Sequence, residues 1–175
     1  DKIGGMTKVD KRKVVRTVVN AVYKQIFVDG YFHADPHPGN ILILKHNKIA
    51  FLDFGIVGYF DDELREKVSN IFISMIQGNL DSIAESLINL GVVEADVSLS
   101  LLKHDLKDQL ERYYGTELKD IDLPMLFTRV ITLARKNNMS LPTDLVLLSK
   151  AMITIQGFAA ELDPKFNLVS FSRPF

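Results

Sequence analysis

Two short segments decide how this chain folds: HADPHPGN at residues 33–40 and DFG at residues 53–55. In the first, Asp35 and Asn40 lie five positions apart, and Asp53 opens the second. The apolar runs 41–44 and 49–52 between them predict two short strands joined by a turn at residues 45–48. Because Asn40 precedes the first strand and Asp53 follows the second, an antiparallel hairpin would bring their backbones within about 5 Å.

Outside this region the sequence predicts helices. Asp10 is suited to cap a helix that runs to about Asp29 and ends at Gly30. Further helices are expected from a cap at Asp61 or Asp62 to about residue 77, and over residues 80–90 and 98–114. Two more carry Pro124 and Pro142 in their first turns, the last reaching about residue 162. We therefore predict a mainly α fold with one small β-hairpin, forming a single domain over residues 1–175.

Composition narrows the classes of function. The 21 basic and 22 acidic residues nearly cancel, and no basic block suits nucleic-acid binding, so no nucleic-acid partner is expected. The absence of cysteine excludes disulfides, thiolate metal sites and Cys nucleophiles. No uninterrupted apolar run approaches the roughly 20 residues that span a bilayer. The chain starts at Asp1 without an initiator Met, and we expect it to be part of a longer protein.

The spacing of the two segments is typical of the catalytic loop and the metal-binding segment of kinases. The Asp53 carboxylate and the Asn40 amide oxygen are predicted to hold Mg²⁺ and, with it, a nucleotide phosphate. Asp35 is the predicted catalytic residue, because a carboxylate there can orient a hydroxyl or a water molecule and accept its proton. His33 is expected to support the loop through hydrogen bonds to backbone carbonyls, and Phe54 to pack beneath it.

A rival interpretation is a metal hydrolase whose ligands are His33, Asp35 and His37, with Asp53 as a bridge. Alternation along an extended segment would put the first three on one face, but two prolines in the same stretch argue against it. Phosphorylation of peptides is also disfavoured, because only residues 56–60 separate DFG from the next helix and no Ala-Pro-Glu motif follows. A small-molecule acceptor, or water, fits better.

The motifs resemble the UbiB family of atypical protein-kinase-like proteins. The resemblance is carried by DGYFHADPHPGNIL at residues 29–42, FLDFG at 51–55, LP at 141–142 and LDPKFN at 162–167. It implies the C-terminal (large) lobe of a protein-kinase-like fold that binds ATP with Mg²⁺ or Mn²⁺, with Asp35 catalytic and Asn40 and Asp53 as metal and nucleotide ligands. It also implies ATPase activity, a link to ubiquinone or isoprenoid-lipid metabolism, a lipid-like acceptor, and a cytoplasmic location with peripheral membrane contact.

The N-terminal nucleotide lobe of that family has no counterpart in these 175 residues. Its alanine-rich nucleotide loop, its Lys-x-Gly-Gln motif and its ion-paired Lys and Glu are absent, so this piece alone is expected to be inactive. Two alternatives stay open. One is a small-molecule phosphotransferase of the aminoglycoside or choline kinase type, which shares the His-x-Asp-x-x-x-x-Asn loop. The other is a non-catalytic, kinase-shaped scaffold that binds a partner or a lipid.

Overall fold

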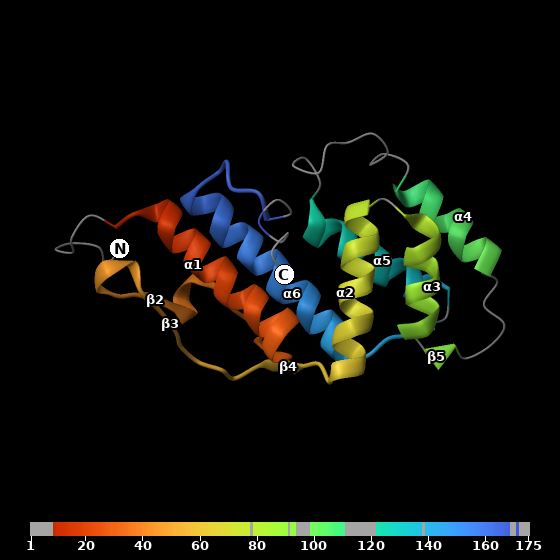
Figure 1. The fold of residues 1–175 in the computed structure, drawn as a ribbon, viewed down its shortest axis with the longest axis horizontal. Helices are drawn as coiled ribbons and strands as arrows, with labels where there is room; N and C mark the ends of the chain where they lie inside the picture. The colour runs from red at the N-terminus through yellow and green to blue at the C-terminus, as the bar shows by residue number, and fades with distance from the viewer. Residues whose placement is uncertain are drawn as a thin grey trace.

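The computed structural model describes residues 9–77, 79–90, 92–93, 99–110, 122–137, 139–168 and 171. Within them the chain is mostly helical with small antiparallel strand pairs, which confirms the predicted mainly α, kinase-like fold class. Two long helices, α1 and α6, lie side by side, α2 to α5 pack at one end of the pair, and the strands follow one edge (Figure 1). The prediction of a single domain stays a prediction.

Helix α1 (Lys11–Tyr23) begins where the sequence predicts. The Asp10 side chain caps it by accepting a hydrogen bond from the Lys13 backbone N–H at 3.1 Å. A π-helical segment, Lys24–Asp29, continues the helix, and Gly30 ends it with a φ of 71°. The π-helical geometry itself was not predicted. The face that the helix buries is made almost entirely of valines: Val14, Val15, Val18, Val19, Val22 and Tyr23.

Helix α6 (Thr143–Leu162) runs antiparallel to α1 and forms the other half of this core (Figure 1). Its buried positions are apolar apart from one serine: Leu145, Leu148, Ser149, Ala151, Met152, Ile155, Phe158 and Ala159. The two helices are also joined where α1 starts and α6 ends, by an ion pair between Arg12 and Asp163 at 3.6 Å. Pro142 precedes α6 as its N-cap, whereas the sequence placed it inside the first turn.

By length and composition, α6 could cross a membrane, although the sequence has no uninterrupted apolar run of that length. Over 18 of its residues the mean hydropathy is 1.4, and 44% of that stretch is buried inside the structure. The core helix of a soluble protein passes the same test, and α6 packs against α1 and α5. Ser149 and Lys150 interrupt the apolar residues of α6, but the mean hydropathy of the 18-residue stretch stays high despite these two polar residues.

The predicted hairpin is present and is accompanied by a strand pair that was not predicted. Strands β2 (Ile41–Ile43) and β3 (Ile49–Phe51) pair in antiparallel register, and the turn between them includes Asn47 at a φ of 57°, as expected. Strand β1 (Tyr31–His33) pairs with β4 (Val57–Tyr59), so that His33 faces Val57. Strands β1 and β4 have three residues each and lie outside the apolar runs that revealed β2 and β3, so the sequence pattern did not indicate them.

The remaining helices form a second group. Helices α2 (Asp62–Gln77) and α3 (Leu80–Leu90) match their predicted spans, and α4 (Leu99–Leu110) covers the described part of the helix expected over 98–114. Helix α5 (Leu123–Lys136) carries Pro124 in its first turn, as predicted. Strands β5 (Val92–Val93) and β6 (Met139–Ser140) form a third small pair. Residues 111–114 lie outside the described residues.

Candidate functional site

The two motif segments lie opposite each other because an antiparallel strand pair holds them together at each end. At one end, next to the β1–β4 pair, the Ala34 backbone N–H donates to the Ile56 carbonyl at 3.0 Å. At the other, next to the β2–β3 pair, the Leu52 N–H donates to the Asn40 carbonyl at 2.8 Å. Residues 34–40 and 52–56 are thereby held as two facing stretches of irregular backbone. We call this arrangement the site frame.

His33 joins the two sides of the site frame. Its side chain is 1% exposed, Nε2 lies 3.2 Å from the Leu52 carbonyl oxygen, and Nδ1 accepts from the Asp35 backbone N–H at 3.2 Å. These bonds define the tautomer, since the nitrogen that faces the carbonyl must carry the proton. The expected supporting role of His33 agrees with this geometry. Phe54 contacts the His33 ring at a centroid distance of 4.8 Å but is 53% exposed, so it lies on the surface and not beneath the loop.

Asn40 and Asp35 are in direct contact. The Asn40 amide Nδ2 donates to the Asp35 backbone carbonyl at 3.2 Å, and Pro38–Asn40 form one 3-10 turn that fixes the Asn40 backbone. With its nitrogen committed in this way, the Asn40 amide leaves its oxygen free to accept or to bind a cation. Asp35 and Asn40 are both half-buried, so each keeps a side accessible to a ligand.

Asp53 has an uncommon backbone conformation. Its φ is 49°, in the left-handed region that few residues other than glycine adopt, and its Oδ1 accepts from the Gly55 N–H at 3.1 Å. No hydrogen bond or ion pair joins the Asp53 side chain to that of Asp35 or Asn40. Asp53 is exposed, so its second oxygen is accessible. An acid oxygen and an amide oxygen on one frame are hard ligands of the kind that Mg²⁺ takes while sharing phosphate oxygens.

A fourth side chain, which the sequence analysis did not connect with the site, reaches the frame from α6. The Lys150 ammonium lies 3.0 Å from Oδ2 of Asp35, and the two side chains are 48% and 31% exposed. The sequence gives no local signal for this contact, because α6 and the loop are far apart along the chain. What the sequence does show is that Lys150 interrupts the apolar residues of α6.

The rival metal-hydrolase interpretation is not supported. Both ring nitrogens of the buried His33 are used within the frame, and His37 Nδ1 accepts from the Gly39 N–H at 3.0 Å. Among the described residues, no three His, Cys, Asp or Glu side chains gather as a metal site. The loop also turns, with the His37 backbone N–H donating to the Asp35 carbonyl at 2.8 Å, and residues 34–37 are not in a strand.

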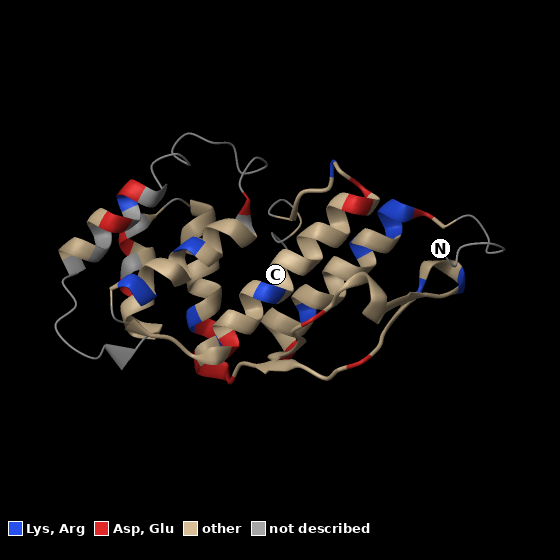
Figure 2. Cartoon of the chain, turned by 180° about the vertical axis from the view of Figure 1, so that it is seen from behind, with Lys and Arg blue, Asp and Glu red and all other residues tan. Residues whose placement is uncertain are grey.

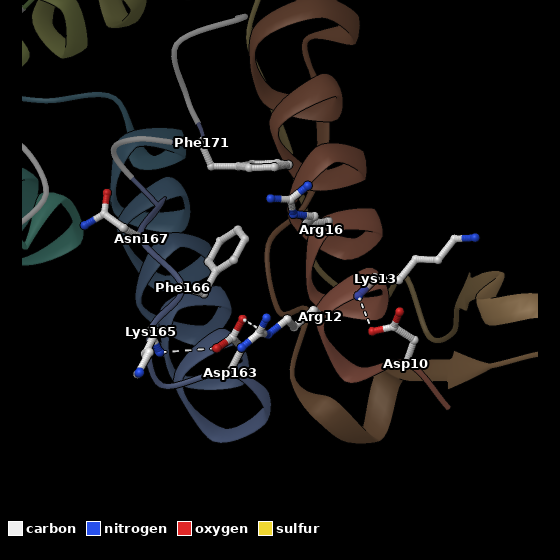
Figure 3. Close-up of a pocket in the computed structure, with 9 residues that line it drawn as sticks. All are labelled: Asp10, Arg12, Lys13, Arg16, Asp163, Lys165, Phe166, Asn167 and Phe171. Carbon is white, nitrogen blue, oxygen red and sulfur yellow. Dashed lines mark hydrogen bonds and ion pairs between the residues drawn. The ribbon is translucent and has the colours of Figure 1, made fainter. Parts of the chain in front are cut away.

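A cavity of about 780 Å³ lies elsewhere, between the start of α1 and the segment that follows α6. None of the four side chains of the site frame lines it. Its walls, drawn in Figure 3, combine basic, acidic and aromatic residues: Asp10, Arg12, Lys13, Arg16, Asp163, Lys165, Phe166, Asn167 and Phe171. In the site frame, by contrast, Asp53 and Phe54 are exposed. Elsewhere the charges are mixed, with basic and acidic residues interspersed along the helices (Figure 2).

Comparison with known proteins assigns the chain to a class and then to a family. A model of the ABC1 atypical kinase-like domain matches residues 2–87, which include the whole site frame, and a model of the UbiB helical domain matches residues 106–167. The class is therefore that of atypical kinase-like proteins. Within it, the chain belongs to the UbiB family, as its motifs indicated.

One curated relative is a protein of Clostridium pasteurianum described as an uncharacterized protein in the hydrogenase 1 5′ region. It is 27% identical to this chain over 166 residues, which are 95% of the chain and 31% of the relative. The chain thus spans about a third of the length of that relative. No solved structure matches the chain.

Proposed function

We propose that this chain is the catalytic lobe of an ATP-dependent enzyme that transfers the γ-phosphoryl group to a small or lipid-like molecule, or to water. Asn40 and Asp53 would hold Mg²⁺ or Mn²⁺ with the nucleotide, and Asp35 would orient the acceptor and take its proton. The bound metal would neutralise charge on the phosphates. The family further suggests an acceptor linked to ubiquinone or isoprenoid lipids, at a cytoplasmic location in peripheral contact with a membrane.

The observation that carries this proposal is the site frame itself. In it, the Asn40 amide Nδ2 donates to the Asp35 backbone carbonyl at 3.2 Å. The backbone N–H of Leu52, the residue before Asp53, donates to the Asn40 carbonyl at 2.8 Å. Phosphoryl transfer needs positioning and charge neutralisation more than covalent chemistry, and a rigid loop with two oxygen ligands supplies both. The scaffold alternative is disfavoured, because a chain that only binds a partner has no physical need for this arrangement.

The frame does not discriminate between a UbiB-type ATPase and a phosphotransferase of the aminoglycoside or choline kinase type, since both require the same three side chains. Membership of the UbiB family favours the first. Phosphate release from ATP without an added acceptor supports the ATPase, whereas turnover only with an aminoglycoside or an amino alcohol supports the second.

Replacing Asp35 by Asn tests the catalytic assignment. In the full-length protein, D35N should bind ATP with Mg²⁺ about as tightly as the wild type, because Asp35 is not a predicted metal ligand. Its kcat for ATP hydrolysis should fall by about 10²–10⁴-fold, the typical contribution of a positioned base. Calorimetry gives the binding and phosphate release gives the turnover. Unchanged hydrolysis would show that Asp35 is not catalytic.

A further inference from the structure

Among the described residues, Lys150 is a basic side chain that forms an ion pair with the site frame, and it comes from a different part of the fold. Residues 33–40 and 52–56 contain no Lys or Arg of their own, and the only lysines between them, Lys45 and Lys48, lie in the turn of the hairpin. The Lys150 ammonium contacts Oδ2 of Asp35 at 3.0 Å. The cation is thus supplied by α6 and not by the loop.

The position of Lys150 is well defined although its side chain is half exposed. Its neighbours Ser149, Ala151 and Met152 are buried, so the backbone of α6 is fixed in the core at this turn. A second contact ties α6 to the frame, since the Asp144 carboxylate accepts from the Tyr59 backbone N–H in β4 at 2.9 Å. The two contacts are about 9 Å apart along the helix. Helix α6 therefore sets the distance between Lys150 and the loop.

The negative charge that gathers in the proposed reaction would be offset by the ion pair between Lys150 and Asp35. Asp35 and Asp53 place two carboxylates on one frame, and a nucleotide phosphate brings further negative charge toward them. A carboxylate that faces the acceptor is repelled by the incoming phosphoryl group unless a cation lies beside it. Because both side chains are partly exposed, the ion pair itself adds little to the stability of the fold.

We infer that Lys150 is a positioning residue of the proposed phosphoryl transfer. It orients the Asp35 carboxylate toward the acceptor and offsets its charge while the phosphoryl group is transferred. The inference rests on the proposed function of the site frame. It extends the site from three side chains to four, and it makes α6 part of the active centre.

The test compares K150M with K150R in the full-length protein. The first keeps the length of the side chain and removes its charge, while the second keeps the charge. The matched control is K136M, because Lys136 on α5 forms a similar ion pair with Asp105 at 2.9 Å, away from the site frame. For each variant we would measure kcat and KM for ATP hydrolysis, the affinity for Mg-ADP by calorimetry, and the thermal midpoint.

We expect K150M to lower kcat at least about tenfold while KM and the ADP affinity change less than about twofold, which is the signature of an interaction needed only in the reaction. K150R should retain kcat within about threefold, and K136M should match the wild type. Because Lys150 acts through Asp35, adding K150M to D35N should lower kcat no further.

Two results would overturn the inference. In one, K150M keeps the kcat of the wild type. In the other, kcat, ADP affinity and thermal midpoint fall together, which would make Lys150 a support of the fold only. Failure of the underlying proposal is distinguishable, because then D53A would hydrolyse ATP normally. An inactive D53A with a fully active K150M would refute the role of Lys150 alone.

Discussion

Among single residues, three side chains of the site have distinct structural roles. His33 joins the loop to the DFG segment, the Asn40 nitrogen fixes the loop backbone, and Asp53 adopts a left-handed φ of 49°. Asp35, Asn40 and Asp53 were chosen from motif spacing, which is local information, and their roles stay predictions. The Lys150 contact could not be predicted, because it depends on how α6 packs against the rest of the fold.

Another single residue, Tyr23, is expected to make the fold less stable at alkaline pH. Its hydroxyl donates to the Leu168 carbonyl at 3.2 Å, and burial raises the pKa of Tyr23 far above its usual value. Above about pH 10 the unfolded chain ionises this group while the folded chain keeps it neutral, so stability falls as pH rises. The contribution of Tyr23 to this fall should be at most about 1.4 kcal/mol per pH unit.

Urea unfolding at pH 8 and at pH 11 measures the effect. The Y23F variant loses the hydrogen bond to Leu168 and should be less stable than the wild type at pH 8 by about 1 kcal/mol. Its loss of stability between the two pH values should be smaller than that of the wild type, since the group that resists ionisation is gone. An equal loss in both proteins would contradict the assignment.

At the scale of elements, the helices were predicted better than the strands. Caps and glycines predicted the start of α1, the end of the π-helical segment that continues it, and the spans of α2 and α3 nearly to the residue, because these signals act locally. The hairpin of β2 and β3 was found from two apolar runs and a turn. The β1–β4 pair was missed, because it joins two three-residue strands across the whole hairpin and leaves no periodic pattern.

The β1–β4 pair should be sensitive to the size of one residue. A Cβ added at Gly58 would lie 2.1 Å from the ring of Phe32, which is itself buried against Phe60. G58A should therefore lower the free energy of unfolding by about 1–3 kcal/mol through overpacking. Urea denaturation measures the change.

Gly157 provides the matched control, since it is exposed on α6 and a Cβ there would meet nothing within 4 Å. G157A should raise the free energy of unfolding by about 0.5–1 kcal/mol, because alanine loses less backbone entropy than glycine in a helix. If G58A were as stable as the wild type, Phe32 would not hold β4 in the position described.

At the scale of the whole molecule, the site frame forms an open edge of a helical lobe. Apolar side chains around it are exposed, with Leu52 at 44%, Phe54 at 53% and Ile56 at 42%. In the proposed function this chain would supply ligands on one side of a nucleotide, and it spans 31% of the length of a relative. We therefore expect ATP to bind tightly only to the full-length protein, which makes that protein the correct material for testing the site.

Calorimetric titration of the full-length protein with ATP, with and without Mg²⁺, shows whether Asp53 holds the metal and its nucleotide. The variants to compare are D53A and, as a control, D62A, because the Asp62 side chain is 95% exposed and forms an ion pair with Arg65 on the surface of α2. We predict that Mg²⁺-dependent binding is lost in D53A and unchanged in D62A. Retention of metal-dependent affinity in D53A would contradict the claim that Asp53 holds the metal and its nucleotide.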